Sequence, residues 1–521
     1  MLAAVLSEGY LKPQKSEPKV NIMTTVRTVH KVIATGFAGT LLASCALGPD
    51  FKRPDAPQAN YSSRALPSEI ASAQGPGGTP QRFVPGQSVA GAWWELYQSP
   101  ALNALVTEAI ANNPTLEAAE ATLRQADEIY KAERDAFWPY VEGTAGFNRQ
   151  QSFQGFQNNG GGSRSPYSIA TAQVSVSYSP DIFGLTRRTV EGYDARREAA
   201  LFQKEAAFLT LTSNVVLTAI EEASLSAQVA ATEDILGAQT QQLEVLRKQL
   251  ELGGIPEVQV LQQLTQVAQT RASLAPLQKA QSAARNRLLA LVGRFPDQDK
   301  GEVVDLTKLV LPRDLPVSLP SELVTQRPDI RAAEASLHAA SADIGVATAN
   351  IFPRLTLNAN YGSSAGRLED LFTAGTGVWG VGAGLLQPIF RGGELFHRRK
   401  AIIAAYDAAA AQYRGTVLGA FQNVSDVLKA LELDATALSA QVESEAAARE
   451  NFEIAKLQLE TGGTSFLSFL DAQRSYQQAR IALVQAQASR FSDTAALFVA
   501  LGGGWEQREQ ESANAGTTQV E

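Results

Sequence analysis

Apolar residues recur along the chain with two different periods. In the segments 172–178 and 355–361 they fall on every second position and alternate with Gln, Ser, Thr and Asn. This alternation predicts β-strands that have one apolar and one polar face. We expect the segments 140–150 and 378–387 to pair with these strands, so that the chain forms two hairpins.

The stretch 373–390 has 18 uncharged residues and could be mistaken for a transmembrane helix. Its glycines are poor helix formers, and Trp379, Val381 and Leu385 fall on one face at period two. A strand is therefore the better interpretation. An apolar strand face beside a polar one suggests a transmembrane β-barrel with a wet interior, and a half-buried soluble sheet is the alternative.

Two long proline-free runs, 187–252 and 394–460, are rich in Ala, Leu, Glu and Gln. At about 1.5 Å per residue they predict helices about 100 Å long. Each run ends in a Gly-Gly pair, which is typical of a helix C-terminus, and we expect a second helix to return from each turn. Shorter helical stretches, 101–136 and 321–351, end at an aromatic-Pro pair.

The two halves of the chain repeat each other. Eight residues of the segment 114–139 recur 214 positions later in 328–353, and the segment 250–254 recurs in part at 459–463. The predicted fold is mainly α with a small β part, built as two tandem structural repeats of long antiparallel helices with four strands per protomer. Four strands cannot close a transmembrane barrel, so protomers must pool them. Two protomers would give eight strands and three would give twelve, and the count alone does not choose.

The N-terminal region has the layout of a secretory signal, because the uncharged segment 32–44 follows Arg27, His30 and Lys31. A helix of this length reaches about 20 Å, which is too short for a hydrocarbon core of about 30 Å. The segment runs into Leu-Ala-Ser-Cys, which looks like a bacterial lipobox, so we expect a covalent lipid on Cys45 and no other cofactor. A free thiol after an ordinary signal is the alternative.

These features divide the chain into six parts. They are a signal peptide (1–44, with Met23 as an alternative start), a lipidated N-terminal linker (45–100), a first repeat (101–293), a Pro-rich connector (294–320), a second repeat (321–503) and a C-terminal tail (504–521).

The composition narrows the function further. With 45 Lys+Arg against 53 Asp+Glu the net charge is −8, and no basic block supports a nucleic-acid partner. One cysteine and three histidines exclude a disulfide within the chain and a Cys/His zinc site.

The sequence also carries none of the common phosphate-loop, serine-hydrolase or zinc-protease motifs, so we expect neither an enzyme nor a metal site. His338 and His397 are interpreted as surface or packed residues, and Trp93 and Trp94 as packing anchors.

Four motifs in a fixed order carry a family resemblance. They are Cys45-Ala-Leu-Gly-Pro-Asp-Phe-Lys-Arg-Pro54, Trp93-Trp-Glu-Leu-Tyr-Gln-Ser-Pro-Ala-Leu102, the paired Ala-Ala-Glu-Ala repeats and Ala500-Leu-Gly-Gly-Gly-Trp505. Together they resemble the TolC-like outer-membrane efflux proteins, in the NodT/OprM-type lipoprotein branch that serves resistance-nodulation-division (RND) pumps. The resemblance implies a homotrimer, a shared twelve-stranded transmembrane barrel and a periplasmic helical tunnel, which selects three protomers over two.

The same resemblance implies two sites on each protomer. A periplasmic membrane-fusion adaptor would dock at the tip formed by Gly253, Gly254, Gly462, Gly463 and Thr464. Asp471, with Leu467 one turn before it, would form the periplasmic gate, because three carboxylates around a narrow axis repel each other and a leucine ring can dewet a pore. The matching position in the first half is Gln262, and a solvated acid at a helix start is the alternative role for Asp471.

The leading hypothesis is therefore a passive exit duct of a tripartite RND efflux pump. The protein would be held in the outer membrane by its covalent lipid and by the barrel. It would conduct small toxic compounds or drugs delivered by the adaptor and an inner-membrane RND transporter. Two alternatives remain open: an outer-membrane duct of a type I protein secretion system, and a lipid-anchored coiled-coil scaffold without a pore.

Overall fold

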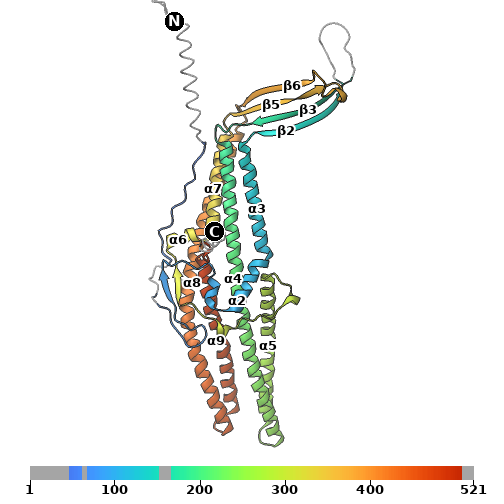
Figure 1. The fold of residues 1–521 in the computed structure, drawn as a ribbon. Helices are drawn as coiled ribbons and strands as arrows, with labels where there is room; N and C mark the ends of the chain where they lie inside the picture. Colours follow the sequence, from blue (N-terminus) through green and yellow to red (C-terminus); the bar gives the residue numbers. More distant parts are fainter. Residues whose placement is uncertain (1–45, 62–66, 68, 152–165, 507–521) are drawn as a thin grey trace, which may run out of the picture. The chain divides into compact units, whose positions relative to one another are not determined.

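The computed structural model describes residues 46–61, 67, 69–151 and 166–506, and Figure 1 shows the arrangement of their elements. The strands are β1 (Arg82–Pro85), β2 (Tyr140–Gln150), β3 (Tyr167–Tyr178), β4 (Asp314–Val317), β5 (Arg354–Ala365) and β6 (Gly377–Leu386). The helices are α2 (Pro100–Asn112), α3 (Pro114–Arg134), α4 (Leu185–Glu251), α5 (Glu257–Leu291), α6 (Pro320–Gln326), α7 (Pro328–Ala349), α8 (Glu394–Glu460) and α9 (Phe466–Ala500), with a short 3-10 helix η1 (Trp93–Tyr97).

The chain divides into two compact units. Among the described residues, the sheet unit contains Ala46 and Leu47 with those of Pro139–Arg187 and Ala349–Ile389, and the helical unit contains those of Gly48–Trp138, Arg188–Thr348 and the chain from Phe390 to Glu506.

The four long strands expected from the sequence form one antiparallel sheet in the order β2-β3-β5-β6. The two predicted hairpins are present, and β3 pairs with β5, which joins the strands of the two halves of the chain. The register places Val141, Val176, Ala359 and Val381 opposite one another in one row across the sheet.

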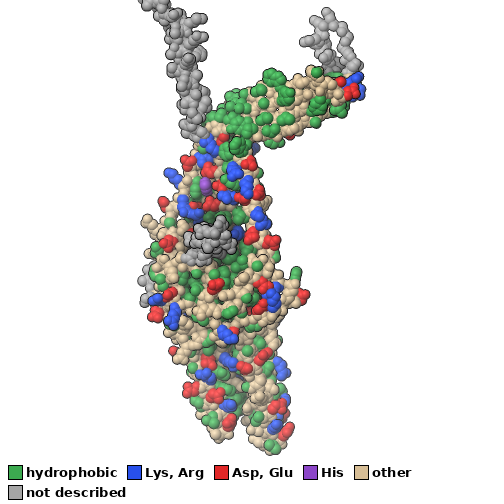
Figure 2. All heavy atoms as spheres, viewed as in Figure 1, with side chains coloured by type: hydrophobic (Ala, Val, Ile, Leu, Met, Phe, Trp, Pro, Cys, Tyr) green, Lys and Arg blue, Asp and Glu red, His purple; other side chains and the backbone are tan. Residues whose placement is uncertain are grey.

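The neighbouring row across the sheet is polar. It contains Glu142, Ser175, Asn360 and Gly380, so it lies on the other face, as the period-two pattern predicts. Large apolar side chains on the sheet are open to solvent in the single chain, among them Tyr361 and Trp379. Figure 2 shows hydrophobic side chains, in green, gathered over the strands, whereas most of the charged side chains lie over the helices.

The helical unit contains two long helical hairpins. The helices α4 and α8 have 67 residues each, and α5 and α9 have 35 residues each. Figure 1 shows α8 and α9 running side by side, which agrees with their contacts. Both hairpins are the proline-free runs and return helices that the sequence predicts.

Two helical stretches that the sequence analysis treated as continuous are in fact broken by proline. The stretch 101–136 divides at Asn113, whose side chain accepts hydrogen bonds from the backbone N–H groups of Thr115 and Leu116 and so caps α3. The stretch 321–351 divides at Arg327, between α6 and α7. In each case a proline begins the following helix, where its missing N–H costs nothing.

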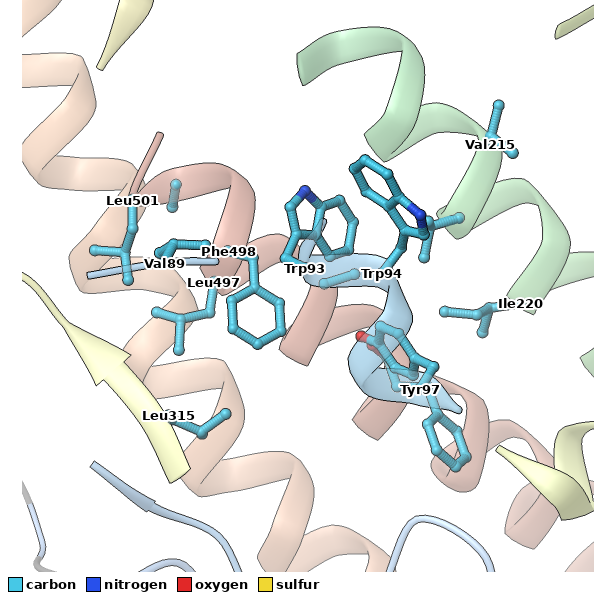
Figure 3. Close-up of a cluster of buried hydrophobic side chains, with 14 of the residues drawn as sticks. Val89, Trp93, Trp94, Tyr97, Val215, Ile220, Leu315, Leu497, Phe498 and Leu501 are labelled. Atoms are coloured by element: carbon cyan, nitrogen blue, oxygen red, sulfur yellow. The ribbon is translucent and has the colours of Figure 1, made fainter. Parts of the chain in front are cut away.

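The main core of the helical unit surrounds η1, and Figure 3 shows its centre. Trp93 and Tyr97 are fully buried, and the ring centroid of Trp93 lies 5.6 Å from that of Phe498 on α9. The Tyr97 hydroxyl donates a hydrogen bond to the backbone oxygen of Phe491 at 2.8 Å. The interpretation of Trp93 and Trp94 as packing anchors is therefore confirmed.

A second, parallel sheet was not predicted. It contains β1 and β4, which pair from Arg82 with Asp314 to Pro85 with Val317. These strands lie in the segments that the sequence analysis interpreted as a linker and a Pro-rich connector. The pairing fixes the N-terminal segment to the junction between the two halves of the chain.

Candidate functional site: the ends of the two helical hairpins

The two helical hairpins turn with the same backbone geometry. Gly253 and Gly462 have φ angles of +73° and +76°, a left-handed conformation that favours glycine. In each turn the N–H of the following glycine bonds to the carbonyl oxygen five residues earlier, Gly254 to Gln249 at 2.8 Å and Gly463 to Gln458 at 2.7 Å. The first glycine N–H also bonds to the carbonyl three residues earlier. Both turns are therefore Schellman motifs.

The return helices begin differently after these turns. Pro256 is the N-cap residue of α5, and its side chain accepts no capping hydrogen bond because it has no acceptor atom. Ser465 caps α9, since its hydroxyl oxygen accepts a hydrogen bond from the backbone N–H of Ser468 at 3.1 Å. Thr464 lies between the second turn and this cap and is half-buried.

Leu467 and Asp471 lie on the exposed stripe of α9, four residues apart. The Leu467 residue is 56% exposed and the Asp471 side chain is 65% exposed. Phe466, Phe469 and Leu470 are buried and pack with residues of α4, α5 and α8 in one apolar cluster. The buried stripe therefore fixes the rotation of α9, so that the proposed gate residues face outward from the protomer's own core.

The structure adds a residue that sequence reasoning missed, Arg474, which follows Asp471 by one turn. Its Nη1 lies 3.7 Å from the Asp471 carboxylate, and its Nε donates a hydrogen bond to Oε1 of Gln266 on α5 at 2.6 Å. Gln266 is buried. One guanidinium therefore connects the exposed carboxylate to the other hairpin.

Further polar contacts connect α9 to α4. Arg480 forms an ion pair with Asp234 at 3.0 Å, and the Gln485 amide donates to Gln228 at 3.1 Å. Gln262, which matches Asp471 in the first hairpin, is half-buried on α5. The first hairpin thus presents a neutral amide at the position where the second presents a carboxylate.

Cys45, the expected lipidation site, lies outside the described residues. The chain that follows it packs within the sheet unit, because the backbone N–H of Leu47 donates to Phe183 at 3.3 Å. A Cβ on Gly184 would lie 2.6 Å from the Ala46 Cα, so the two backbones approach closely there. The residue after Cys45 is therefore anchored to the strand-bearing part of the chain.

The two histidines that the structure describes are both partnered. His338 on α7 stacks on Phe51 with ring centroids 4.4 Å apart, and its Nε2 lies 3.0 Å from the Glu191 carboxylate. His397 is exposed on α8 beside Phe396. Within the described ranges, no group of three or more His, Cys, Asp or Glu could hold a metal ion. None of the described helices is both long and apolar enough to cross a membrane.

Comparison with known proteins agrees with this geometry. The family model described as outer membrane efflux protein matches residues 105–294 and 319–503. The chain is 31% identical over 470 residues to the probable efflux pump outer membrane protein TtgC of Pseudomonas putida, covering 89% of this chain and 94% of the relative. It is 30% identical over 422 residues to the pyoverdine export outer membrane protein OpmQ of Pseudomonas aeruginosa, covering 80% and 88%.

A solved structure shares the fold. The outer-membrane channel OprN superimposes with a TM-score of 0.78 at 27% identity, over 88% of this chain and all of that chain. Paired helical hairpins and a sheet with one apolar face thus define an outer-membrane efflux channel, and not an enzyme. The chain belongs to the outer membrane efflux protein family.

Proposed function

We propose that this chain forms a homotrimer that serves as the passive exit duct of a tripartite RND-type efflux pump. The observation that carries the proposal is the four-stranded sheet, whose outer strands β2 and β6 each pair with only one of the described strands and so have one unpaired edge each. Unpaired strand edges are not tolerated in a hydrocarbon core. Three such sheets would close a twelve-stranded barrel and leave the apolar row of each sheet facing lipid.

A duplicated unit supports this symmetry. The family model matches the chain twice, and the paired long helices have equal lengths of 67 and 35 residues. Six similar helical hairpins around one axis would build the periplasmic tunnel of the trimer. The proposed boundaries of the two repeats, 101–293 and 321–503, follow from the same argument.

The lower end of this tunnel would carry the gate. Asp471 and Leu467 share the exposed stripe of α9, and neither side chain is used in the protomer's own core. In a trimer, three Asp471 carboxylates would narrow the pore electrostatically and three Leu467 side chains would exclude water. The turns at Gly253-Gly254 and Gly462-Gly463-Thr464 would be the docking tip for the periplasmic adaptor.

Lipidation of Cys45 would add a second attachment to the outer membrane. Leu47 is bonded within the sheet unit, so an acyl chain on Cys45 would start close to the strands that span the bilayer. Replacing Cys45 by Ser should abolish the incorporation of labelled palmitate. Unchanged labelling of the Ser variant would contradict this assignment.

The cargo would be small and chemically varied. The names of relatives specify toluene in one case and pyoverdine in another, so the family accommodates unlike compounds. We expect this duct to pass small toxic organic compounds that a partner pump selects. Deletion of the gene should lower the tolerated concentration of such compounds several-fold, and a plasmid copy should restore it. Unchanged tolerance to every exported class, with the trimer present in the wild type, would contradict the proposal.

A further inference from the structure

The start of α8 concentrates positive charge in a way that the sequence analysis did not single out. Residues 398–400 are Arg-Arg-Lys, the only three consecutive Lys or Arg residues in the chain, and Arg391 precedes them. We call residues 390–400 the α8 entry segment. Against these four cations it contains a single acid, Glu394, so its net charge is +3 with neutral histidine.

Two of these cations have no acidic partner in the described part of the protein. Glu394 pairs with Arg398 at 2.9 Å, and Arg399 turns inward to donate to the Thr348 hydroxyl at 3.0 Å. Arg391 and Lys400 are exposed and form no ion pair with any described carboxylate. The Lys400 ammonium instead lies over the ring of Phe396, 4.6 Å from its centroid.

The start of α4, which matches this segment in the first half, shows the contrast. There Arg187 pairs with Asp181 at 3.2 Å, and Arg188 pairs at 2.7 Å with both Asp50 and Glu191. Glu191 occupies the position that matches Lys400, 209 residues earlier. The charge at the start of α4 is therefore neutralised within the protein, whereas the charge at the start of α8 is left for an outside partner.

Exposed aromatic side chains lie among these cations. Phe390 is 88% exposed and Phe396 is 54% exposed. Exposed aromatic and basic side chains in one short segment are typical of a membrane–water interface, where rings lie at the headgroup level and long cationic side chains reach the phosphates.

The covalent chain limits how far this segment can lie from the bilayer. β6 ends at Leu386, five residues before Arg391. An extended chain covers at most about 3.6 Å per residue, so Arg391 lies within about 18 Å of the end of a strand that the proposed function places in the membrane. A strand that spans the bilayer ends at the polar headgroup region, so the proposed function places Arg391 near the headgroups.

We propose that the α8 entry segment binds the phosphates of anionic phospholipids in the periplasmic leaflet of the outer membrane, with Arg391 and Lys400 as the principal contacts. The inference rests on the proposed function, because the partner is available only if the sheet spans the bilayer. Headgroup binding fixes the upper end of the helix whose lower end carries the tip turn.

The test uses the full-length protein, purified in detergent and titrated with phosphatidylglycerol or phosphatidylcholine while bound lipids are counted by native mass spectrometry. The double variant Arg391→Gln/Lys400→Gln removes the two unpaired cations. Arg414→Gln/Arg449→Gln removes two exposed cations further along α8 and leaves the net charge the same as in the first variant. Inorganic phosphate at millimolar concentration is added in a separate series.

The wild type should prefer phosphatidylglycerol, and the first double variant should weaken its binding by roughly 25-fold, about fivefold for each basic residue near an anionic surface. The control double variant should stay within about twofold of the wild type, since its charges lie farther from the headgroups. Equal binding of the two lipids by the wild type would overturn the inference. An equal loss in both double variants would overturn it too, because net charge would then explain the binding.

Displacement of phosphatidylglycerol by inorganic phosphate would also overturn it, by revealing a general phosphate site. The same spectra report the subunit number, and bilayer recordings report conductance. A wild type that is not trimeric or does not conduct would contradict the proposed function, whatever its lipid preference. A conducting trimer without that preference would contradict this inference alone.

Discussion

The Arg474 guanidinium on α9 donates a hydrogen bond to the side-chain oxygen of Gln266 on α5 at 2.6 Å, although the two residues are 208 positions apart in the sequence. The same guanidinium lies 3.7 Å from the carboxylate of Asp471. If the part of α9 that carries Asp471 moves away from the hairpin of α4 and α5, this contact must break. The buried Gln266 amide then loses its partner.

Replacing Arg474 by Met should raise the conductance of the reconstituted trimer. The substitution keeps an unbranched side chain but removes the hydrogen bond to Gln266. Leaving a buried polar group unpaired costs about 1–3 kcal/mol, so the closed state should become less stable. Single-channel recording measures the effect. Arg480→Met is the matched control, since it removes an ion pair with an exposed Asp234 that contributes less than about 1 kcal/mol. Equal conductance of the two variants would show that the Arg474 contact does not hold the closed state.

The turn between α8 and α9 should tolerate alanine at Gly463 but not at Gly462. Gly462 has a φ of +76°, so alanine there is strained by about 1–2 kcal/mol. A Cβ on Gly463 would meet only ordinary contacts, the nearest at 3.5 Å. Thermal unfolding of Gly462→Ala should therefore begin at a lower temperature than that of Gly463→Ala. If Gly463→Ala were the less stable variant, the turn geometry described for α8 would be wrong.

Gly504 should tolerate no larger residue. Gly504 has a φ of +67°, and a Cβ there would lie 2.4 Å from the Val89 carbonyl oxygen. Because both the backbone strain and the clash with backbone oppose alanine, Gly504→Ala should destabilise the protein by about 3 kcal/mol or more. Gly86→Ala separates the two effects, since Gly86 has a φ of +77° but open space around it. We expect about 1 kcal/mol for that control in chemical unfolding.

Asp493 on α9 should make the stability of the helical unit depend on pH. Burial, with a hydrogen bond to Asp434 of α8, raises the pKa of its carboxyl from 3.8 to about 7. The folded chain thus holds a proton that the unfolded chain releases between about pH 4 and pH 7, so stability should fall as pH rises through that window. The full difference in pKa would correspond to about 4 kcal/mol, and about half of that is expected for a carboxyl partly open to solvent.

The Asp493→Asn variant should lose this component, so its melting temperature should fall less between pH 5 and pH 8 than that of the wild type. Asp407→Asn, an exposed position on α8, serves as the control. Parallel pH profiles of wild type and Asp493→Asn would refute the assigned role of this carboxyl.

The elements that could be predicted from the sequence are those whose pattern runs over many consecutive residues. The run 394–460 coincides with α8, and the Gly-Gly pairs end α4 and α8 as expected. The period-two segments predicted β3, β5 and β6, because alternation over several residues is hard to mistake for a helix, and β2 was expected as a pairing partner. Their apolar row, from Val141 to Val381, then follows from pairing in register.

What the sequence could not predict depends on contacts between distant residues. β1 and β4 have four residues each, contain proline and lie more than 200 positions apart, so neither has a recognisable period. The link between Arg474 and Gln266 has no sequence signal either, since an arginine one turn after an aspartate is ordinary on a solvated helix. The break at Asn113 could have been found, because Asn-Pro is a strong signal for a helix start.

The central claim is that three copies of this chain form a conducting duct closed at the Asp471 end. The most direct test is the conductance of purified wild-type and Asp471→Ala trimers in planar lipid bilayers. We predict a small conductance for the wild type and a several-fold larger one for the variant, because removal of three facing carboxylates relaxes the constriction. Correctly assembled trimers that conduct no ions, with or without Asp471, would contradict the account.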